Sequence, residues 1–290
     1  MGDPCEGMAC EAPTAWCDGG TIVEYSGSGN CEGGTCNYQG VETRRDCLAS
    51  EACYNAECVQ VPQEGDLIIT EYLANPGDTD DYKEWFEIYN TRLNRLYLGG
   101  MIVKDMDQDS VTIAEGTFVE GHSYFVFGWG ATSIVGGPDF DWSTVGFFQL
   151  ANETDEIILE YGGAIIDSVM YSHCDGCFPH PNGASVSLEP TLISSDNNVG
   201  AHWCKGTSNF GVGTSLGTPG VANTPCFACT DATLAIACPI PSNYCDDAEH
   251  ALQYSVPACV NDYCDYTSAA SLVDCGNQVC FDGACIDSPD

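Results

Sequence analysis

The spacing of the cysteines at the two ends of the chain constrains its fold more than any other feature. Cys10–Cys58 contains seven cysteines at steps of 7, 14, 5, 11, 6 and 5 residues, and Cys238–Cys285 contains seven at steps of 7, 14, 5, 11, 5 and 5. Tyr38 and Tyr266 each lie two residues after the corresponding cysteine. Because chance rarely produces such agreement, we interpret the two ends as copies of one module of about 55 residues.

Both copies are expected to be held together by disulfides. With Cys5 and Cys229 included, each copy has eight cysteines and predicts four internal bridges. A module this small, rich in Gly, Asp and Asn, buries too little apolar surface to fold without cross-links. A pair of zinc modules is the alternative, but the two blocks contain a single histidine, His250, and do not follow the paired C-x2-C spacing of zinc ribbons. We therefore expect disulfide-rich modules at residues 1–62 and 226–290, in an oxidising compartment.

The charge of the chain excludes several classes of partner. Acidic residues number 43 against 7 lysines and arginines, for a formal net charge of −36, and they are spread over the whole chain. Binding to phosphate backbones or anionic membranes requires clustered basic residues, so we expect no nucleic-acid partner. No apolar run approaches the ~20 residues that span a bilayer, so no membrane insertion is expected. Met1–Pro4 lacks the features of a signal peptide, and secretion to the exterior or cell surface would use a signal that precedes this sequence.

The centre of the chain, residues 63–225, predicts an all-β sandwich. Short β-branched and aromatic runs alternate with turn residues, and no amphipathic helical window interrupts them. In the second run Phe86 and Ile88 share one face, which we expect to be in the core. Gly162-Gly163 between the last two runs predicts a tight hairpin. The runs are Leu67–Leu73, Trp85–Tyr89, Leu98–Lys104, Val111–Ile113, Ser123–Phe127, Phe147–Leu150, Glu156–Tyr161 and Ala164–Tyr171.

A series of short motifs runs through this centre in a fixed order. The motifs are Ile69-Thr70-Glu71, Asn75-Pro76, Glu84 to Asn90, Leu98-Gly99-Gly100, Gly116-Thr117, Ile166 to Tyr171, Gly183 to Glu189 and Gly217 to Asn223. Their order resembles that of lamin-tail domains.

The resemblance implies an immunoglobulin-like β-sandwich without shared catalytic residues, and it implies an accessory or surface module, as in bacterial secreted members. Met101 replaces the tryptophan usual in the family, and the extra cysteines are a second departure. The flanking cysteine spacing resembles repeats of myxobacterial-type secreted proteins.

Four cysteines lie outside the two repeats, at Cys174, Cys177, Cys204 and Cys226. With three histidines in the same stretch they could bind zinc tetrahedrally. We favour two structural disulfides. Cys204–Cys226 would fasten the C-terminal arm of the sandwich, and Cys174–Cys177 would close a four-residue loop. A redox role for the second pair is the remaining alternative, but no cationic neighbour lowers a thiol pKa there.

Calcium is the one cofactor that we expect. Asp105, Asp107 and Asp109 place three carboxylates on alternate residues of a turn, as oxygen-ligand loops often do. The alternative is a solvated acidic turn, because Asp favours turns through bonds to its own backbone. A second acidic loop contains Asp78, Asp80 and Asp81.

Motifs for catalysis are missing from the sequence. There is no Gly-x-Ser-x-Gly elbow, phosphate-binding loop, His-Glu-x-x-His or dinucleotide fingerprint, so we expect no enzymatic activity. Aromatic residues cluster in a glycine-rich stretch, where most should be core. Trp129 and Trp142 could instead present a binding surface for a polymer or a partner protein.

Together these features predict a secreted, non-catalytic structural or adhesion protein that displays a β-sandwich between stapled modules. The expected partners are a second copy of the chain through self-association, an extracellular protein or a polysaccharide. The competing hypothesis is the accessory binding part of a larger secreted hydrolase or nuclease.

Overall fold

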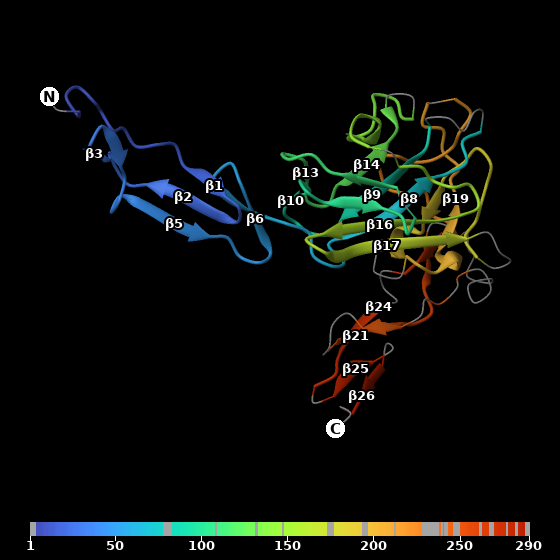
Figure 1. The fold of residues 1–290 in the computed structure, drawn as a ribbon. Helices are drawn as coiled ribbons and strands as arrows, with labels where there is room; N and C mark the ends of the chain where they lie inside the picture. The colour runs from blue at the N-terminus through green and yellow to red at the C-terminus, as the bar shows by residue number, and fades with distance from the viewer. Residues whose placement is uncertain are drawn as a thin grey trace.

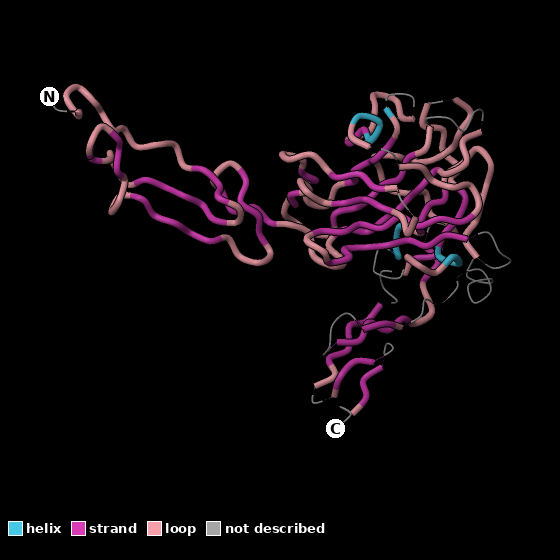
Figure 2. Tube along the Cα trace, viewed as in Figure 1, coloured by secondary structure: helices cyan, strands magenta, loops and turns pink. Residues whose placement is uncertain are grey.

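Strands form nearly all of the regular structure in the computed structural model of this chain (Figures 1 and 2). Its described residues contain short 3-10 turns but no α-helix, and therefore no helix long and apolar enough to cross a membrane. The all-β fold with a disulfide-bonded module at each end is confirmed. The described residues are 4–77, 83–107, 109–130, 133–146, 148–172, 177–192, 197–211, 213–227, 238, 240, 243–245, 250–260, 263–266, 270–276, 278–281 and 284–287.

Two sheets form the central sandwich. The larger sheet has the order β15-β14-β9-β8-β18-β19, in which β15 runs parallel to β14 and all other neighbours are antiparallel. Its strands are β8 (Leu67–Leu73), β9 (Trp85–Asn90), β14 (Tyr124–Gly128), β15 (Phe140–Asp141), β18 (Val186–Leu188) and β19 (Trp203–Lys205). The smaller sheet, in the order β12-β11-β16-β17, contains β12 (Ser110–Thr112), β11 (Ile102–Lys104), β16 (Thr154–Tyr161) and β17 (Ala164–Ser172). β10 (Leu96–Tyr97) pairs with β13 (Phe118–Val119) beside them.

The core lies between the two sheets because alternate strand residues point inward. Phe86 and Ile88 are fully buried there, as the sequence predicts, and the Phe86 ring stacks on Phe127 with centroids 4.5 Å apart. The opposite face of β9 is also covered, since Trp85 packs in a second cluster with Leu73. Both faces of β9 are therefore covered by packed side chains. Each fully buried side chain of this size contributes ~2–3 kcal/mol to folding.

Two of the predicted strands differ in the structure. The run Leu98–Lys104 was expected to be one strand, but β10 ends at Tyr97 and β11 begins at Ile102. Gly100 between them has a φ of 84°, a left-handed conformation that breaks the strand. The prediction of a strand at 147–150 is wrong for its described residues, 148–150, which carry no ladder. The Gly162-Gly163 hairpin is confirmed, with φ values of 59° and 90°.

The two flanking modules have the same strand order, as two copies of one module would. Each has a three-stranded sheet and two hairpins. One hairpin lies in sequence between the second and third strands of the sheet, and the other follows the third strand. In the first copy these are β1 (Trp16–Asp18), β2 (Thr21–Tyr25) and β5 (Glu42–Asp46), with hairpins β3–β4 (Asn30–Glu32, Thr35–Asn37) and β6–β7 (Glu51–Tyr54, Glu57–Gln60). In the second they are β20 (Tyr244–Cys245), β21 (His250–Tyr254) and β24 (Ala270–Asp274), with hairpins β22–β23 (Ala258–Val260, Tyr263–Asp265) and β25–β26 (Val279–Phe281, Ala284–Ile286).

Disulfides cross-link both copies, and the two pairings described in the second copy match two of the first. The four bridges expected in the first copy are present, as Cys5–Cys31, Cys10–Cys36, Cys17–Cys53 and Cys47–Cys58. In the second copy Cys238–Cys264 and Cys275–Cys285 occupy the positions of the second and fourth of these bridges. Cys259 and Cys280 are also disulfide-bonded, and Cys229 lies outside the described residues.

Candidate functional site

Two glutamates lie opposite each other in the middle of the larger sheet. Glu71 on β8 is the register partner of Glu87 on β9, and both side chains are fully buried. A bulge in β8 between Ile69 and Glu71 makes this possible. The extra residue shifts the alternation by one position, so Glu71 leaves the core face and joins Glu87 on the outer face of the sheet.

A segment from the C-terminal end of the sandwich covers this pair. We call residues 217–223 the strap. Thr218 donates its backbone N–H to Glu71 Oε1 over 3.0 Å and its hydroxyl to Oε2 over 2.9 Å. Gly220 donates its N–H to Glu87 Oε2 over 2.5 Å. The strap therefore supplies hydrogen bonds to carboxylate oxygens that have no access to water.

Side chains of the sheet itself complete the hydrogen bonding of the pair. Ser185, just before β18, and Ser187, on β18, donate their hydroxyls to Glu71 Oε1 over 2.5 and 2.7 Å. Thr70 donates to Glu87 Oε1 over 2.9 Å. All four glutamate oxygens thus accept at least one hydrogen bond, as buried carboxylates require.

The strap approaches the sheet so closely that its first residue must be glycine. A Cβ added at Gly217 would lie 2.9 Å from the Trp85 ring and 3.0 Å from Ser185 Oγ. Any side chain there would lift the strap away from the carboxylates. Asn223, at the other end, donates its side-chain amide to the carbonyls of Thr70 and Leu188 over 2.8 and 2.9 Å.

Burial changes the acidity of the pair. It raises the pKa of Glu71, against the opposing effect of the hydrogen bonds from Ser185, Ser187 and Thr218. Burial, and secondly the charge of Glu71, raise the pKa of Glu87 well above its ordinary value. Two carboxylates that share one buried site do not both ionise readily, so the pair tends to retain a proton.

A disulfide and a third buried glutamate fasten the chain just after the strap. Cys226 is bridged to Cys204 on β19, and its backbone N–H donates to Glu189 Oε2 over 2.7 Å. Glu189 is fully buried, and burial raises its pKa. The strap is consequently held by hydrogen bonds along its length and by a covalent bond beyond its end.

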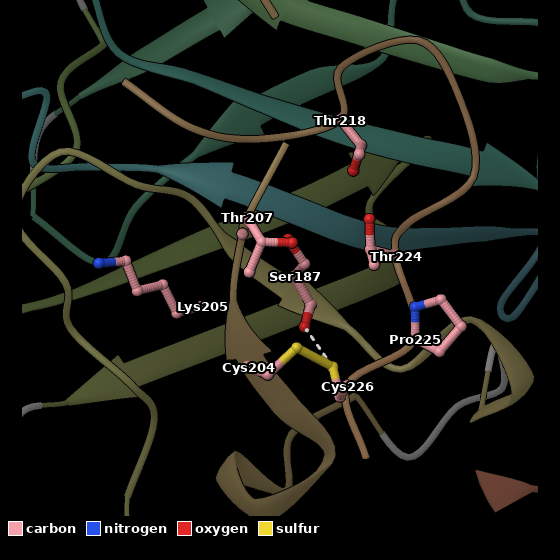
Figure 3. A pocket seen from close by; sticks show the side chains of 9 residues that line it. Ser187, Cys204, Lys205, Thr207, Thr218, Thr224, Pro225 and Cys226 are labelled. Carbon is pink, nitrogen blue, oxygen red and sulfur yellow. Dashed lines mark hydrogen bonds between the residues drawn. A yellow bond between two sulfur atoms is a disulfide. The ribbon is translucent and has the colours of Figure 1, made fainter. Parts of the chain in front are cut away.

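A small cavity lies beside this disulfide, between the strap and β19 (Figure 3). Its volume is about 250 Å³, below the range typical of sites for organic ligands. Figure 3 shows that hydroxyl-bearing side chains gather around it. The lining residues are Ser187, Cys204, Lys205, Gly206, Thr207, Thr218, Thr224, Pro225 and Cys226.

A further carboxylate, that of the half-buried Asp167, joins the two sheets. Asp167 on β17 accepts the backbone N–H of Ile69, at the β8 bulge, over 2.6 Å and the amide of Asn197 over 2.7 Å. Burial raises the pKa of Asp167 to about 7, although these hydrogen bonds oppose the shift. The bulge that places Glu71 thus also frees the Ile69 N–H, which Asp167 satisfies.

The prediction that Trp142 presents a binding surface is wrong. Asp141 accepts the Ser143 N–H and begins the short 3-10 turn η2 (Trp142–Thr144), which directs Trp142 into the core. The ring is fully buried and stacks against Phe86 with centroids 5.9 Å apart. Trp129 is half-buried and packs against the same core.

The aspartates of the Asp105 turn bond to their own backbone. Asp105 Oδ1 accepts the N–H groups of Asp107 and Asp109 over 2.8 and 3.1 Å. Burial, and secondly the charge of Asp105, raise the pKa of Asp109. These three carboxylates are not among the groups whose ligand atoms converge within 4.8 Å. Calcium at this turn stays a prediction.

Other candidates are placed only in part. In the described part of the chain the one group of three convergent ligand atoms is Cys47, Glu51 and Cys58, and its cysteines are bridged to each other. Cys177 is disulfide-bonded. Asp78, Asp80, Asp81 and Cys174 lie outside the described residues.

Sequence reasoning did not select Glu71 and Glu87 as site residues. A signal was available, because each stands inside an apolar or aromatic run where a charge needs a buried partner. The partners could not be found from the sequence, since Thr218 lies 147 residues after Glu71.

Comparison with known proteins gives one match. Residues 60–173 match the family model described as Lamin Tail Domain, so the expected resemblance is confirmed for this stretch. The matched stretch contains Glu71 and Glu87 and ends before the strap. No curated protein and no solved structure matches the chain. The likeness of the flanking modules to myxobacterial-type repeats stays a prediction.

Proposed function

We propose that this chain is a non-catalytic extracellular structural or adhesion protein, in which a lamin tail domain is held rigidly between two stapled modules. The described residues contain seven disulfides, which indicate an oxidising, extracellular environment. A rigid unit of this kind serves display or scaffolding, because its surfaces keep their relative positions.

The observation that carries the proposal is the use of the buried acids. A general acid or base must come within hydrogen-bond reach of its substrate. Glu71 and Glu87, which are register partners on β8 and β9, are fully buried under the strap and bonded to it. These carboxylates bind the C-terminal strap and are closed off from a substrate, which supports a structural role.

Aromatic contacts between the modules and the sandwich support it further. The Tyr54 ring of the first module lies 5.0 Å from Tyr97 and 5.7 Å from Phe118, and the Arg95 guanidinium lies 4.5 Å above Phe118. In the second module Tyr266 packs with Leu192 of the sandwich in one buried cluster. Both modules are therefore docked as well as tethered.

The edges of the sandwich bear on how copies of the chain would associate. β17 is a long edge strand, but Gly65 donates its N–H to the Ile166 carbonyl over 3.1 Å. Asn198 donates to the Ser168 carbonyl over 2.8 Å and accepts the Met170 N–H over 3.2 Å. With this edge covered, self-association would use side-chain surfaces in preference to strand addition.

Turnover and retention assays on the purified, oxidised chain test the proposal. We expect no hydrolysis of ester, glycosidic or phosphodiester substrates, and retention on an immobilised extracellular polysaccharide, matrix protein or second copy of the chain. E87Q is the matched variant, since it keeps the shape of the buried pair. Hydrolysis that wild type performs and E87Q does not would refute the structural role.

A further inference from the structure

The two modules share one fold but dock on the sandwich through opposite ends. In the first copy the β6–β7 hairpin meets the sandwich, where β7 contacts β10 and Tyr54 packs on Tyr97. In the second copy the contact is made near the β22–β23 hairpin. There Cys264 donates its backbone N–H over 2.9 Å to the carbonyl of Phe227, the residue that follows Cys226 and is tied to the sandwich through the Cys204–Cys226 bridge.

The same tyrosine of the repeat has different surroundings in the two copies. Tyr266 is completely buried, in a cluster with Leu192 and against Phe227. Its counterpart Tyr38 is only half-buried. The Tyr38 ring packs edge-on against Tyr25 of its own module with centroids 5.2 Å apart. A surface that is covered in one copy is thus open in the other.

This open surface lies away from the sandwich. Figure 1 shows β3, whose hairpin with β4 carries Cys36 and leads to Tyr38, at the far end of the first module. The second module is reversed: Figure 1 shows its β25–β26 hairpin, the counterpart of the docked β6–β7 hairpin, beside the C-terminus and farther from the sandwich than β21 and β24. The module is a connector with two docking ends, and each copy uses one.

We propose that the Tyr38 end of the first module is a docking surface for the sandwich of a second copy of this chain. The occupant is the surface formed by Leu192 of the sandwich and by Phe227 beside the Cys204–Cys226 bridge, because that surface already packs against the equivalent end of the second module. The hydrogen bond can be repeated as well. Cys31 and Cys36 are paired in their hairpin in the same register as Cys259 and Cys264, so the Cys36 N–H is oriented like that of Cys264.

Within one chain the second module competes for this acceptor surface. A tethered module has a high effective concentration, so wild-type copies exchange modules only weakly. Weakening the contact within the chain should expose the acceptor and favour contact between copies, as in domain exchange. The inference rests on the proposed structural function and names its partner.

Sedimentation velocity on the full chain tests this, at a salt concentration that screens the net charge of −36. Y266A should self-associate about tenfold more tightly than wild type, because it frees the Leu192 surface. Adding Y38A should remove that gain. Adding W16A, which truncates an aromatic side chain 47 % exposed on β1 of the same module, should leave it unchanged. Intact mass should show that all variants keep their disulfides.

Two outcomes would overturn the docking surface. One is that Y266A does not associate beyond wild type; the other is that Y38A/Y266A associates as tightly as Y266A. A measurement without any variant checks the same point. In wild type, amide exchange at Cys36 should slow as the protein concentration rises, and concentration-independent exchange would contradict the proposal. If the docking surface is wrong, the variants will not differ in oligomeric state. If the proposed function is wrong, the wild-type protein will hydrolyse a substrate.

Discussion

Removal of the Cys204–Cys226 disulfide should destabilise the sandwich by releasing the end of the strap. The bridge closes a loop with a sequence separation of 22 residues. The loop-entropy relation gives about 11 cal/mol/K for a loop of this length, or about 3.4 kcal/mol at 25 °C. For a domain of about 160 residues each kcal/mol shifts Tm by about 2–4 °C. C204A/C226A should therefore lower the Tm of the sandwich by about 7–14 °C.

Calorimetry and amide exchange measure the two consequences separately. The calorimetric transition reports the loss of stability. Exchange at the backbone N–H groups of Thr218 and Gly220, which bind Glu71 and Glu87, reports whether the strap has loosened. Both amides should exchange faster in the variant, because the strap is then held by hydrogen bonds alone.

C47A/C58A is the matched control. That bridge lies in the first module and closes a loop with a separation of 11 residues, for which the same relation gives about 2.8 kcal/mol. It should destabilise the module and leave the transition of the sandwich in place. The reasoning is refuted if C204A/C226A shifts the sandwich by less than about 2 °C, or if Thr218 and Gly220 exchange at wild-type rates.

Four further predictions follow from the packing and the buried acids. E71Q should lower the free energy of unfolding in urea by about 1–3 kcal/mol, because the new amide nitrogen cannot accept a hydrogen bond from Thr218. The backbone amides of the strap should also exchange faster in this variant. Because the pKa of Asp167 is raised to about 7 and that of Glu87 is raised well above normal, their stabilising contributions are full below about pH 4 and are lost as pH rises through those values. The urea midpoint should thus fall between about pH 5 and about pH 8, and less steeply in E87Q, which stays neutral. W142A should cost about 3–5 kcal/mol by urea unfolding, whereas a surface tryptophan would cost little. Peptide mapping without reduction should show the pairing order of the first module repeated in the second; a different order would contradict the equivalence of the copies.

Features that depend on spacing and local geometry are determined by the sequence alone. The paired cysteine intervals identify two copies of one module, and cross-links in a small module follow from its poor core. The alternation of Phe86 and Ile88 identifies the core face of β9, because neighbouring strand residues point in opposite directions. Gly162-Gly163 predicts its hairpin because both residues accept positive φ.

Features that depend on which distant segments meet are decided only by the tertiary structure. Glu71 faces Glu87 because of one extra residue in β8, and a shift of one residue exchanges the two faces of a strand. The strap reaches Glu71 across 147 residues of sequence. Trp142 is buried because a 3-10 turn directs it into the core, although its glycine-rich surroundings suggest a surface loop. The two copies of the module also differ in which end is covered. Their shared cysteine spacing specifies a similar framework twice, but the position of each copy in the chain decides which end of it meets the sandwich.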